Sequence, residues 1–282
     1  MIDLLEISKE TSLYDHGFYK IKNKEDLNLT EIINNAKRIE TSAEDQKSGY
    51  STDIYEFLDN ETKLKLNQLA LKFLQYKIVK KYLIFPSLLK IRVLKSKFND
   101  VAFKNPSHAM LWHRDLDDVF SQLKFIIPLN STNKENGAFS VSSKKIASRD
   151  KILIDKKLLM ELKNSKDEYR KEDEVRVSNE MFQKKFSSSI YEFVGDFSDI
   201  LIVDTNKCYH KGGQVLSEGL ERYMLHFHIG SPTNSFHPRM NSKSKNLINL
   251  IHLFSARFVR MLVKIYFFII NKKINSKKII LE

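Results

Sequence analysis

Residues with metal-binding side chains occur in two stretches, LWHRDLDDVF at 111–120 and DILIVDTNKCYHKGGQV at 199–215. In an extended segment, residues two apart point the same way, so His113 and Asp115 can offer an imidazole nitrogen and a carboxylate oxygen to one ion. His210 lies where a buried-looking strand runs into a turn, and it can supply a third ligand. Two histidines and one carboxylate cover one face of an octahedron and leave open positions, as in non-haem iron sites.

Basic residues on predicted strands could bind an anion close to such an ion. Arg222 follows His210 by twelve residues in ERYMLHFHIG, and a buried arginine can hold a carboxylate with two hydrogen bonds. Arg92 and Lys124 could contact an anionic cosubstrate or substrate, or they could be solvated residues at a strand edge. His226 and His228 alternate with Arg222, so either could line a pocket or replace a ligand.

The triplet His-Arg-Asp also begins the catalytic loop of protein kinases, which is the competing interpretation. Kinase chemistry requires an asparagine five residues after the aspartate and a glycine-rich phosphate loop upstream. Phe120 occupies the asparagine position, and only Gly17 and Gly49 precede the triplet. The sequence therefore excludes the kinase interpretation and favours the metal site.

The elements that must position these residues are predominantly strands. From Leu88 onward, short β-rich segments are separated by glycine, asparagine and proline signals, which predicts a barrel or sandwich. An amphipathic helix is predicted over 61–83, where it would brace a sheet. Residues of about 144–189 form a charged insertion that could shape an opening. These segments are LLKIRVLKSKF, HAMLWHRD, QLKFIIPLN, GAFSVSS, IYEFVGD, SDILIVDT and ERYMLHFHIG, and a further short strand is predicted in YDHGFYKIKN.

Together, WHRD, QLKFIIPLNSTNKENGAFSVSSKK, GDFSDILIVDTNKCYHKGG and ERYMLHF resemble the phytanoyl-CoA dioxygenase family of Fe(II)/2-oxoglutarate-dependent oxygenases. The resemblance covers about residues 86–230. It implies a mainly β fold with flanking helices, built on a double-stranded β-helix (jelly-roll) barrel. It also implies Fe(II) bound by His113, Asp115 and His210, and 2-oxoglutarate bound by Arg222. One departure is Met224, which stands where many relatives carry a small hydroxyl residue that contacts the cosubstrate.

The reaction implied by this resemblance is hydroxylation. Such an enzyme would use O2 and 2-oxoglutarate to hydroxylate an unactivated C–H bond of a small-molecule or lipid-like substrate, releasing succinate and CO2. Related halogenases replace the metal-binding carboxylate with a small residue, so the retained Asp115 favours hydroxylation. Nucleic-acid demethylases of the same superfamily typically carry a second arginine six residues after the first, and this position holds His228. The sequence therefore disfavours a nucleic-acid substrate.

Composition and charge indicate one catalytic domain with a basic tail. The 282 residues are 42% hydrophobic, enough for one sizeable core, and we expect a domain over 1–238 and a tail over 239–282. The formal charge is +12, and the tail holds ten Lys/Arg against one acidic residue. The single cysteine, Cys208, rules out an intramolecular disulfide. The N-terminal residues include acidic side chains unlike a signal peptide, so the sequence predicts a cytoplasmic location.

Within the tail, residues 245–270 read as an apolar helix with a narrow basic stripe formed by Arg257, Arg260 and Lys264. Such a helix could lie on the inner membrane surface, or it could pack on the barrel or on a dimer partner. A non-catalytic alternative also follows, in which a vestigial barrel serves as a basic membrane-surface binding module. The intact metal-binding triad and Arg222 count against that alternative.

Overall fold

The computed structural model describes residues 8–22, 29–39, 51–83, 86–104, 106, 108–115, 122–146 and 177–230. The chain divides into two compact units, residues 1–231 and 232–282. The second unit lies outside the described residues, so the predicted boundary after 238 and the predicted helix at 245–270 remain predictions. In the described ranges, no helix combines the length and hydropathy needed to cross a membrane.

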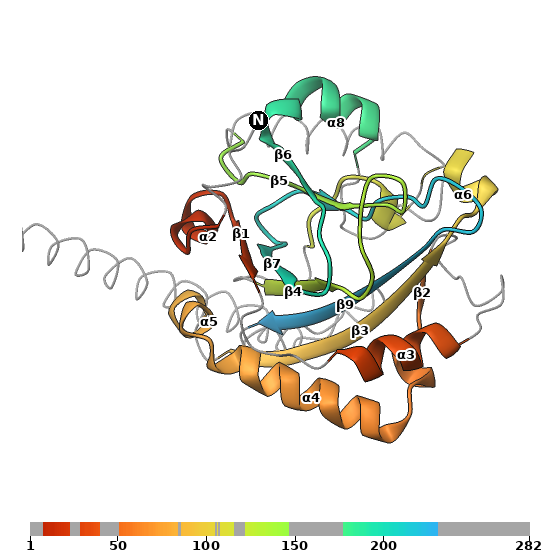
Figure 1. The fold of residues 1–282 in the computed structure, drawn as a ribbon. Helices are drawn as coiled ribbons and strands as arrows, with labels where there is room; N and C mark the ends of the chain where they lie inside the picture. The colour runs from red at the N-terminus through yellow and green to blue at the C-terminus, as the bar shows by residue number, and fades with distance from the viewer. Residues whose placement is uncertain are drawn as a thin grey trace, which may run out of the picture. The chain divides into compact units, whose positions relative to one another are not determined.

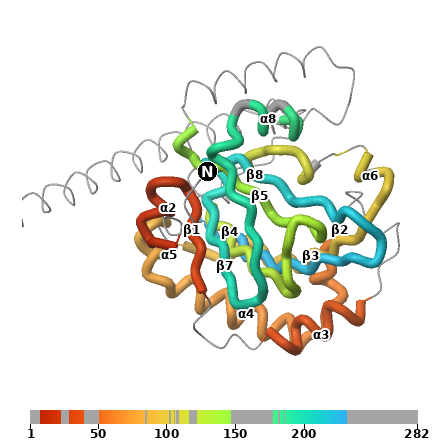
Figure 2. Tube along the Cα trace, turned by 45° about the horizontal axis from the view of Figure 1, so that its top comes forward, coloured from red at the N-terminus to blue at the C-terminus, as the bar shows by residue number. Residues whose placement is uncertain are grey.

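Two antiparallel sheets form the body of the first unit (Figures 1 and 2). The large sheet has the order β1-β7-β4-β9-β3-β2 and the small sheet the order β6-β5-β8. This is a mainly β, double-stranded β-helix fold, as the sequence predicts. The strands are β1 (Phe18–Lys22), β2 (Ser51–Asp53), β3 (Ser87–Lys97), β4 (Gln122–Pro128), β5 (Phe139–Ser142), β6 (Ile190–Phe193), β7 (Asp199–Asp204), β8 (His210–Lys211) and β9 (Glu221–Gly230).

Alternation along the central strands separates the two faces of the large sheet. On β9, Leu225, Phe227 and Ile229 belong to an apolar cluster that includes helical residues. Met224, the residue just before Leu225, instead packs in a second cluster with residues of the small sheet, such as Phe139. Because successive side chains on a strand point to opposite faces, β9 has an outer face towards the helices and an inner face towards the small sheet.

Helices cover the outer face of the large sheet, which Figure 1 shows below β3 and β9. Phe73 of α4 is fully buried, and its ring stacks on Phe125 of β4 with centroids 4.6 Å apart. The predicted brace is therefore confirmed, but the single helix predicted over 61–83 is wrong. It breaks at Tyr76, whose ψ of 131° leaves the helical region. The helices on this side are α3 (Thr30–Arg38), α4 (Asn60–Gln75) and α5 (Lys77–Tyr82).

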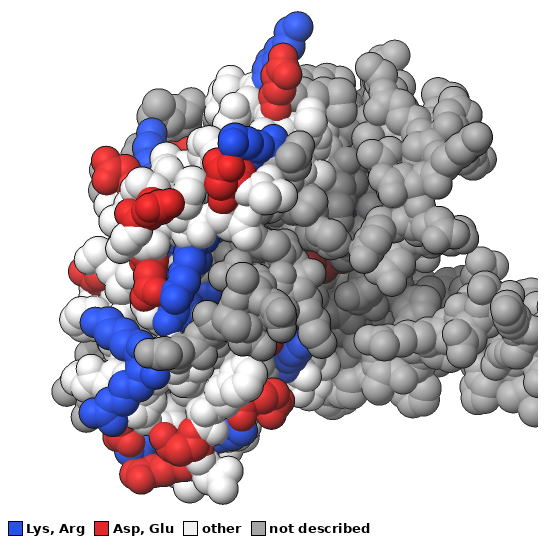
Figure 3. All heavy atoms as spheres, turned by 90° about the vertical axis from the view of Figure 1, so that its right-hand side faces the viewer, with Lys and Arg blue, Asp and Glu red and all other residues white. Residues whose placement is uncertain are grey.

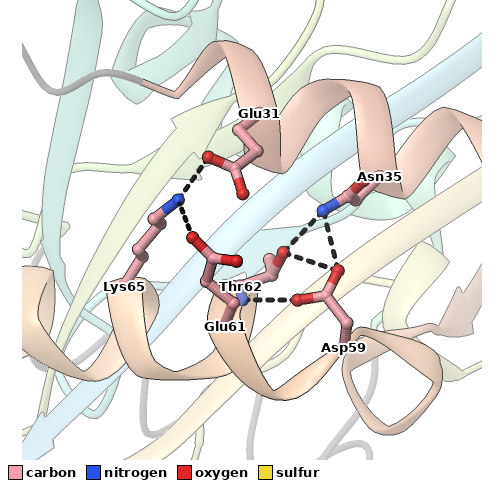
Figure 4. A network of polar contacts seen from close by, with 6 residues as sticks. All are labelled: Glu31, Asn35, Asp59, Glu61, Thr62 and Lys65. Carbon is pink, nitrogen blue, oxygen red and sulfur yellow. Dashed lines mark hydrogen bonds and ion pairs between the residues drawn. The ribbon is translucent and has the colours of Figure 1, made fainter.

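A polar network fixes the start of α4 against α3 (Figure 4). The side chain of Asp59 caps α4 by accepting a hydrogen bond of 2.6 Å from the Thr62 backbone N–H. The same carboxylate accepts from Asn35 of α3 at 2.9 Å, and Lys65 pairs with Glu31 of α3. The bond from Thr62 satisfies a helix N–H that lacks a partner within the helix, and the other two contacts join α4 to α3.

Short helices complete the described part of the chain. The stretch HAMLWHRD, predicted as a strand, instead forms a 3₁₀ turn followed by two isolated bridges at Trp112 and His113. Trp112 is fully buried, and its ring stacks on Phe182 of α8 with centroids 4.2 Å apart. The short helices and 3₁₀ turns are α2 (Thr11–Asp15), α6 (Asp100–Lys104), α8 (Asn179–Phe186), η1 (Tyr55–Phe57), η2 (His108–Met110) and η4 (Ser187–Ser189).

The predicted insertion at 144–189 is described only in part. Residues 147–176 lie outside the described ranges, and α8 belongs to the remainder. On the face drawn in Figure 3, acidic and basic side chains lie beside one another.

Candidate metal centre

A backbone bridge places two histidines side by side at the β8 edge of the small sheet. The N–H of His113 donates to the carbonyl of His210 at 3.0 Å, and the N–H of His210 donates back at 2.8 Å. Residues that exchange both hydrogen bonds lie directly opposite one another with their side chains on the same face. The two imidazole ring centroids are accordingly 4.4 Å apart.

Hydrogen bonds to carbonyl groups orient both imidazoles. Nδ1 of His113 lies 2.8 Å from the carbonyl oxygen of Leu111, and Nδ1 of His210 lies 3.2 Å from that of Cys208. A carbonyl only accepts, so each Nδ1 carries the hydrogen, and each Nε2 is left with a lone pair for a metal. Both histidines are buried, with 6% and 2% of their surface exposed.

Asp115 completes the cluster from the same segment. Its backbone N–H donates to the carbonyl of Thr205 at 3.1 Å. One carboxylate oxygen, Oδ1, lies 4.0 Å from Nε2 of His113 and 3.7 Å from Nε2 of His210. Ligand atoms that share an ion at about 2.1 Å lie roughly 3 Å apart when adjacent, so a small inward movement would suffice. One ligand atom from each of the three residues lies within 4.8 Å of the others.

Charge at the cluster keeps Asp115 ionised. Burial acts to raise the pKa of Asp115, but the positive charge of Lys124 and the nearby His210 and His113 outweigh burial and hold this pKa well below its ordinary value. The Lys124 ammonium lies 2.6 Å from Oδ2, the carboxylate oxygen that the imidazoles do not face. A carboxylate must be deprotonated to bind a metal ion, and the lowered pKa keeps Asp115 in that form.

Of the three predicted anion-binding residues, the structure brings only Lys124 into contact with the triad. Arg92 instead donates from Nε to Oδ2 of Asp53 at 2.9 Å, across to the edge strand β2. Lys124 is on β4 and points inwards, because the residues on either side of it, Leu123 and Phe125, belong to the outer cluster. The sequence alone does not indicate the contact between Lys124 and Asp115, because it depends on how β4 lies relative to the 111–115 segment.

Arg222 lies at the start of β9 with 3% of its surface exposed. Its Nη1 donates to the carbonyl oxygens of Gly137 and Gly213, the latter at 2.9 Å, and its Nη2 donates to Oγ of Ser96 at 3.1 Å. The Gly213 contact ties the guanidinium to the loop that follows His210. Sequence reasoning missed Ser96, although its inward position on β3 follows from the same alternation that places Arg92.

Two glycines allow the backbone segments that bind Arg222 to approach each other closely. Gly137 has φ +89°, in the left-handed region that favours glycine, and a Cβ added to it would lie 2.7 Å from the Gly213 carbonyl oxygen. A Cβ added to Gly213 would lie 2.3 Å from the carbonyl oxygen of Ala138. Close approach of these two backbones therefore lets both carbonyl oxygens point at one guanidinium. In the sequence, the only local sign of this arrangement is the Asn136–Gly137 pair, which is typical of a tight turn.

Comparison with known proteins establishes the fold. No protein-family model and no curated protein sequence matches this chain. Among solved structures, the chain is similar to HygX from Streptomyces hygroscopicus with nickel and 2-oxoglutarate bound, at 14% identity and a TM-score of 0.51, over 82% of this chain and 88% of that one. It is also similar to SnoN, a non-haem α-ketoglutarate-dependent epimerase from nogalamycin biosynthesis, at 11% identity and a TM-score of 0.51, over 79% and 81%. At these identities the likeness shows a shared fold.

Proposed function

We propose that this chain is an Fe(II)- and 2-oxoglutarate-dependent dioxygenase of the phytanoyl-CoA dioxygenase type. It would hydroxylate an unactivated C–H bond of a small-molecule or lipid-like substrate while 2-oxoglutarate and O2 become succinate and CO2. The observation that carries this proposal is the convergence of one ligand atom from each of His113, Asp115 and His210 within 4.8 Å inside a double-stranded β-helix. The solved structures of HygX with 2-oxoglutarate and of SnoN with Fe³⁺ and α-ketoglutarate support it by analogy of fold.

The donor atoms suit a ferrous ion. Two neutral imidazoles and one carboxylate are the facial set that leaves open positions on non-haem iron. Carbonyl groups hold the hydrogen of each imidazole on Nδ1, and outer contacts of this kind fix ligand orientation. Such an ion, when bound, supplies the activation of O2. His113, Asp115 and His210 would hold it, and this assignment remains a proposal.

Arg222 is proposed to bind the far carboxylate of 2-oxoglutarate. Its Nη1 already donates to two carbonyl oxygens, so contact with the carboxylate would use Nε and the second hydrogen of Nη2. These bonds fix the plane of the guanidinium before any ligand arrives, which lowers the entropic cost of binding. The retained carboxylate of Asp115 favours hydroxylation over halogenation, and the proposed catalytic domain spans residues 1–238.

An anaerobic titration tests the proposal without knowledge of the substrate. Fe(II)-loaded protein mixed with 2-oxoglutarate should develop the weak visible charge-transfer band of a bidentate complex. Asp115→Asn should abolish the band. Asp196→Asn, a matched change in the turn before β7 and outside the cluster, should keep it.

Aerobic incubation with 2-oxoglutarate should also release succinate, even without a primary substrate. If the wild-type protein forms no band and releases no succinate, the dioxygenase proposal is wrong. The barrel would then fit the non-catalytic binding module, which requires neither metal nor cosubstrate.

A further inference from the structure

Beyond the metal triad, the inner face of the large sheet carries a second group of polar side chains. His226 and His228 lie towards the end of β9, and His228 pairs in register with Lys124 of β4. Directly opposed residues on neighbouring strands have Cβ atoms about 5 Å apart on the same face. Lys124 and His228 therefore flank one point of the barrel interior, on the side of the sheet where Lys124 contacts Asp115.

The ammonium of Lys124 has donors to spare. It has three N–H groups, and among the described residues its one ion-pair partner is Oδ2 of Asp115, at 2.6 Å. Only 12% of its side chain is exposed, so solvent gives the remaining hydrogens little access. Lys124 can therefore hold Asp115 and still donate to another acceptor.

His228 presents a buried donor that has no acceptor. Nε2 of Gln122 lies 3.0 Å from Nδ1 of His228, so the amide N–H donates to Nδ1. Burial, followed by the charge of Lys124, lowers the pKa of His228 well below its ordinary value, which keeps the ring neutral. The single ring hydrogen is then on Nε2, and this atom is buried without a hydrogen-bond partner among the described residues.

A buried N–H without an acceptor destabilises the fold, and native proteins rarely retain one without a reason. The two donors belong to cross-strand neighbours on the same face of the sheet. One of them is charged, and neither can accept in these states. The ligand that suits them is an oxyanion, because it offers several acceptor lone pairs and a compensating charge.

We propose that Lys124 and His228 form a subsite beside the metal that binds a carboxylate or phosphate group of the primary substrate. This inference rests on the proposed dioxygenase function. Arg222, the proposed partner of 2-oxoglutarate, is six residues before His228 on β9, which corresponds to about 20 Å along the strand. The carboxylate held by Arg222 therefore does not also contact His228, and we assign the group bound at His228 to the primary substrate.

Inorganic phosphate serves as the probe, with the full-length protein loaded with Mn(II) and 2-oxoglutarate. Paramagnetic Mn(II) accelerates ³¹P relaxation only for phosphate bound close to the metal. We expect strong enhancement in the wild type and a loss of about tenfold in phosphate affinity in His228→Leu, the cost of one charge-assisted hydrogen bond. His228→Gln, whose amide N–H can replace the Nε2 donor, should restore most of the affinity.

Two results would overturn the subsite. Equal enhancement in the wild type and in His228→Leu would show that phosphate binds the metal itself, or a site beside it that does not use His228. A loss of 2-oxoglutarate affinity in His228→Leu, measured by calorimetry, without a change in phosphate binding would assign the donor to the cosubstrate. Failure of the wild type to bind Mn(II) and 2-oxoglutarate at all is a separate outcome, which refutes the dioxygenase function and the subsite with it.

Discussion

The two faces of strand β9 have opposite chemistry. Its outer face presents Leu225, Phe227 and Ile229 to the helices. Its inner face presents a guanidinium and two imidazoles within the same ten residues. Outer side chains gain stability by leaving water, whereas inner polar groups lose hydration on burial and need partners.

This difference separates the residues that stabilise the fold from those available for chemistry. Apolar contacts such as Phe73 with Phe125 complete the outer layer within the protein itself. On the inner layer, buried donors such as Nε2 of His228 have no partner in the described part of the chain. We therefore expect substitutions on the outer face to change stability and those on the inner face to change ligand binding.

The largest expected effect is on the outer face. Phe227→Ala removes a fully buried ring whose centroid lies 5.1 Å from that of Phe73, and it should lower the free energy of unfolding by about 3–5 kcal/mol. Urea denaturation of the metal-free protein measures this loss. Leu64→Ala, on the exposed side of α4, is the control and should change stability by no more than about 0.5 kcal/mol. Similar losses in both variants would contradict the assignment of the outer core.

On the inner face, His210→Ala should lower the affinity for Fe(II) or Co(II) by more than about a hundredfold, roughly 2.7 kcal/mol, because it removes a proposed ligand. Anaerobic calorimetry measures the affinity. His16→Ala is the matched control, since His16 is also buried and bonded to Ser143 but is outside the metal cluster. If both variants bind metal equally well, His210 is not a ligand.

A smaller effect, on cosubstrate affinity, is expected at Arg222 near the start of β9. Arg222→Lys keeps the charge but loses the planar fork of donors, so 2-oxoglutarate should bind about tenfold more weakly while metal affinity stays constant. Arg92→Lys provides the comparison, because Arg92 pairs with Asp53. An equal loss of 2-oxoglutarate affinity in the two variants would mean that Arg222 has no special role.

The smallest expected effect is at the start of α4, in the layer that supports the outer face. The backbone hydrogen bond from Thr62 lowers the pKa of Asp59, so this carboxylate stabilises the fold above its unfolded pKa and stops doing so as the pH falls through its lowered folded pKa. Asp59→Ala should therefore lower Tm modestly at pH 7, and the difference from wild type should shrink in acid. Asp59→Asn retains a capping oxygen, so its Tm should respond less to acid. A difference for Asp59→Ala that is independent of pH would show that the ionised carboxylate is not responsible.

Local patterns in the sequence predict much of this architecture. Alternation and turn residues predict β3, β4, β7 and β9, and the strength of that signal reflects one apolar face on each central strand. The juxtaposition of His113, Asp115 and His210 also follows from residue type and spacing, although their role as ligands remains a proposal. By contrast, the break at Tyr76 has no proline or glycine to mark it.

Other features depend on contacts between distant segments and have no local signal. The approach of Lys124 to Asp115 requires β4 to lie beside the segment that bears the aspartate. The three acceptors around Arg222 come from β3, the turn before β5 and the loop after β8. Alternation can say which way a side chain faces, but the identity of its partner depends on how the sheets are assembled.

X-ray absorption spectroscopy of the anaerobic Fe(II)-loaded protein tests the shared metal site most directly. We predict one ferrous ion per chain with two imidazoles in its coordination shell, and one imidazole fewer in His210→Ala. A spectrum without imidazole scattering, or one that His210→Ala leaves unchanged, would contradict the account.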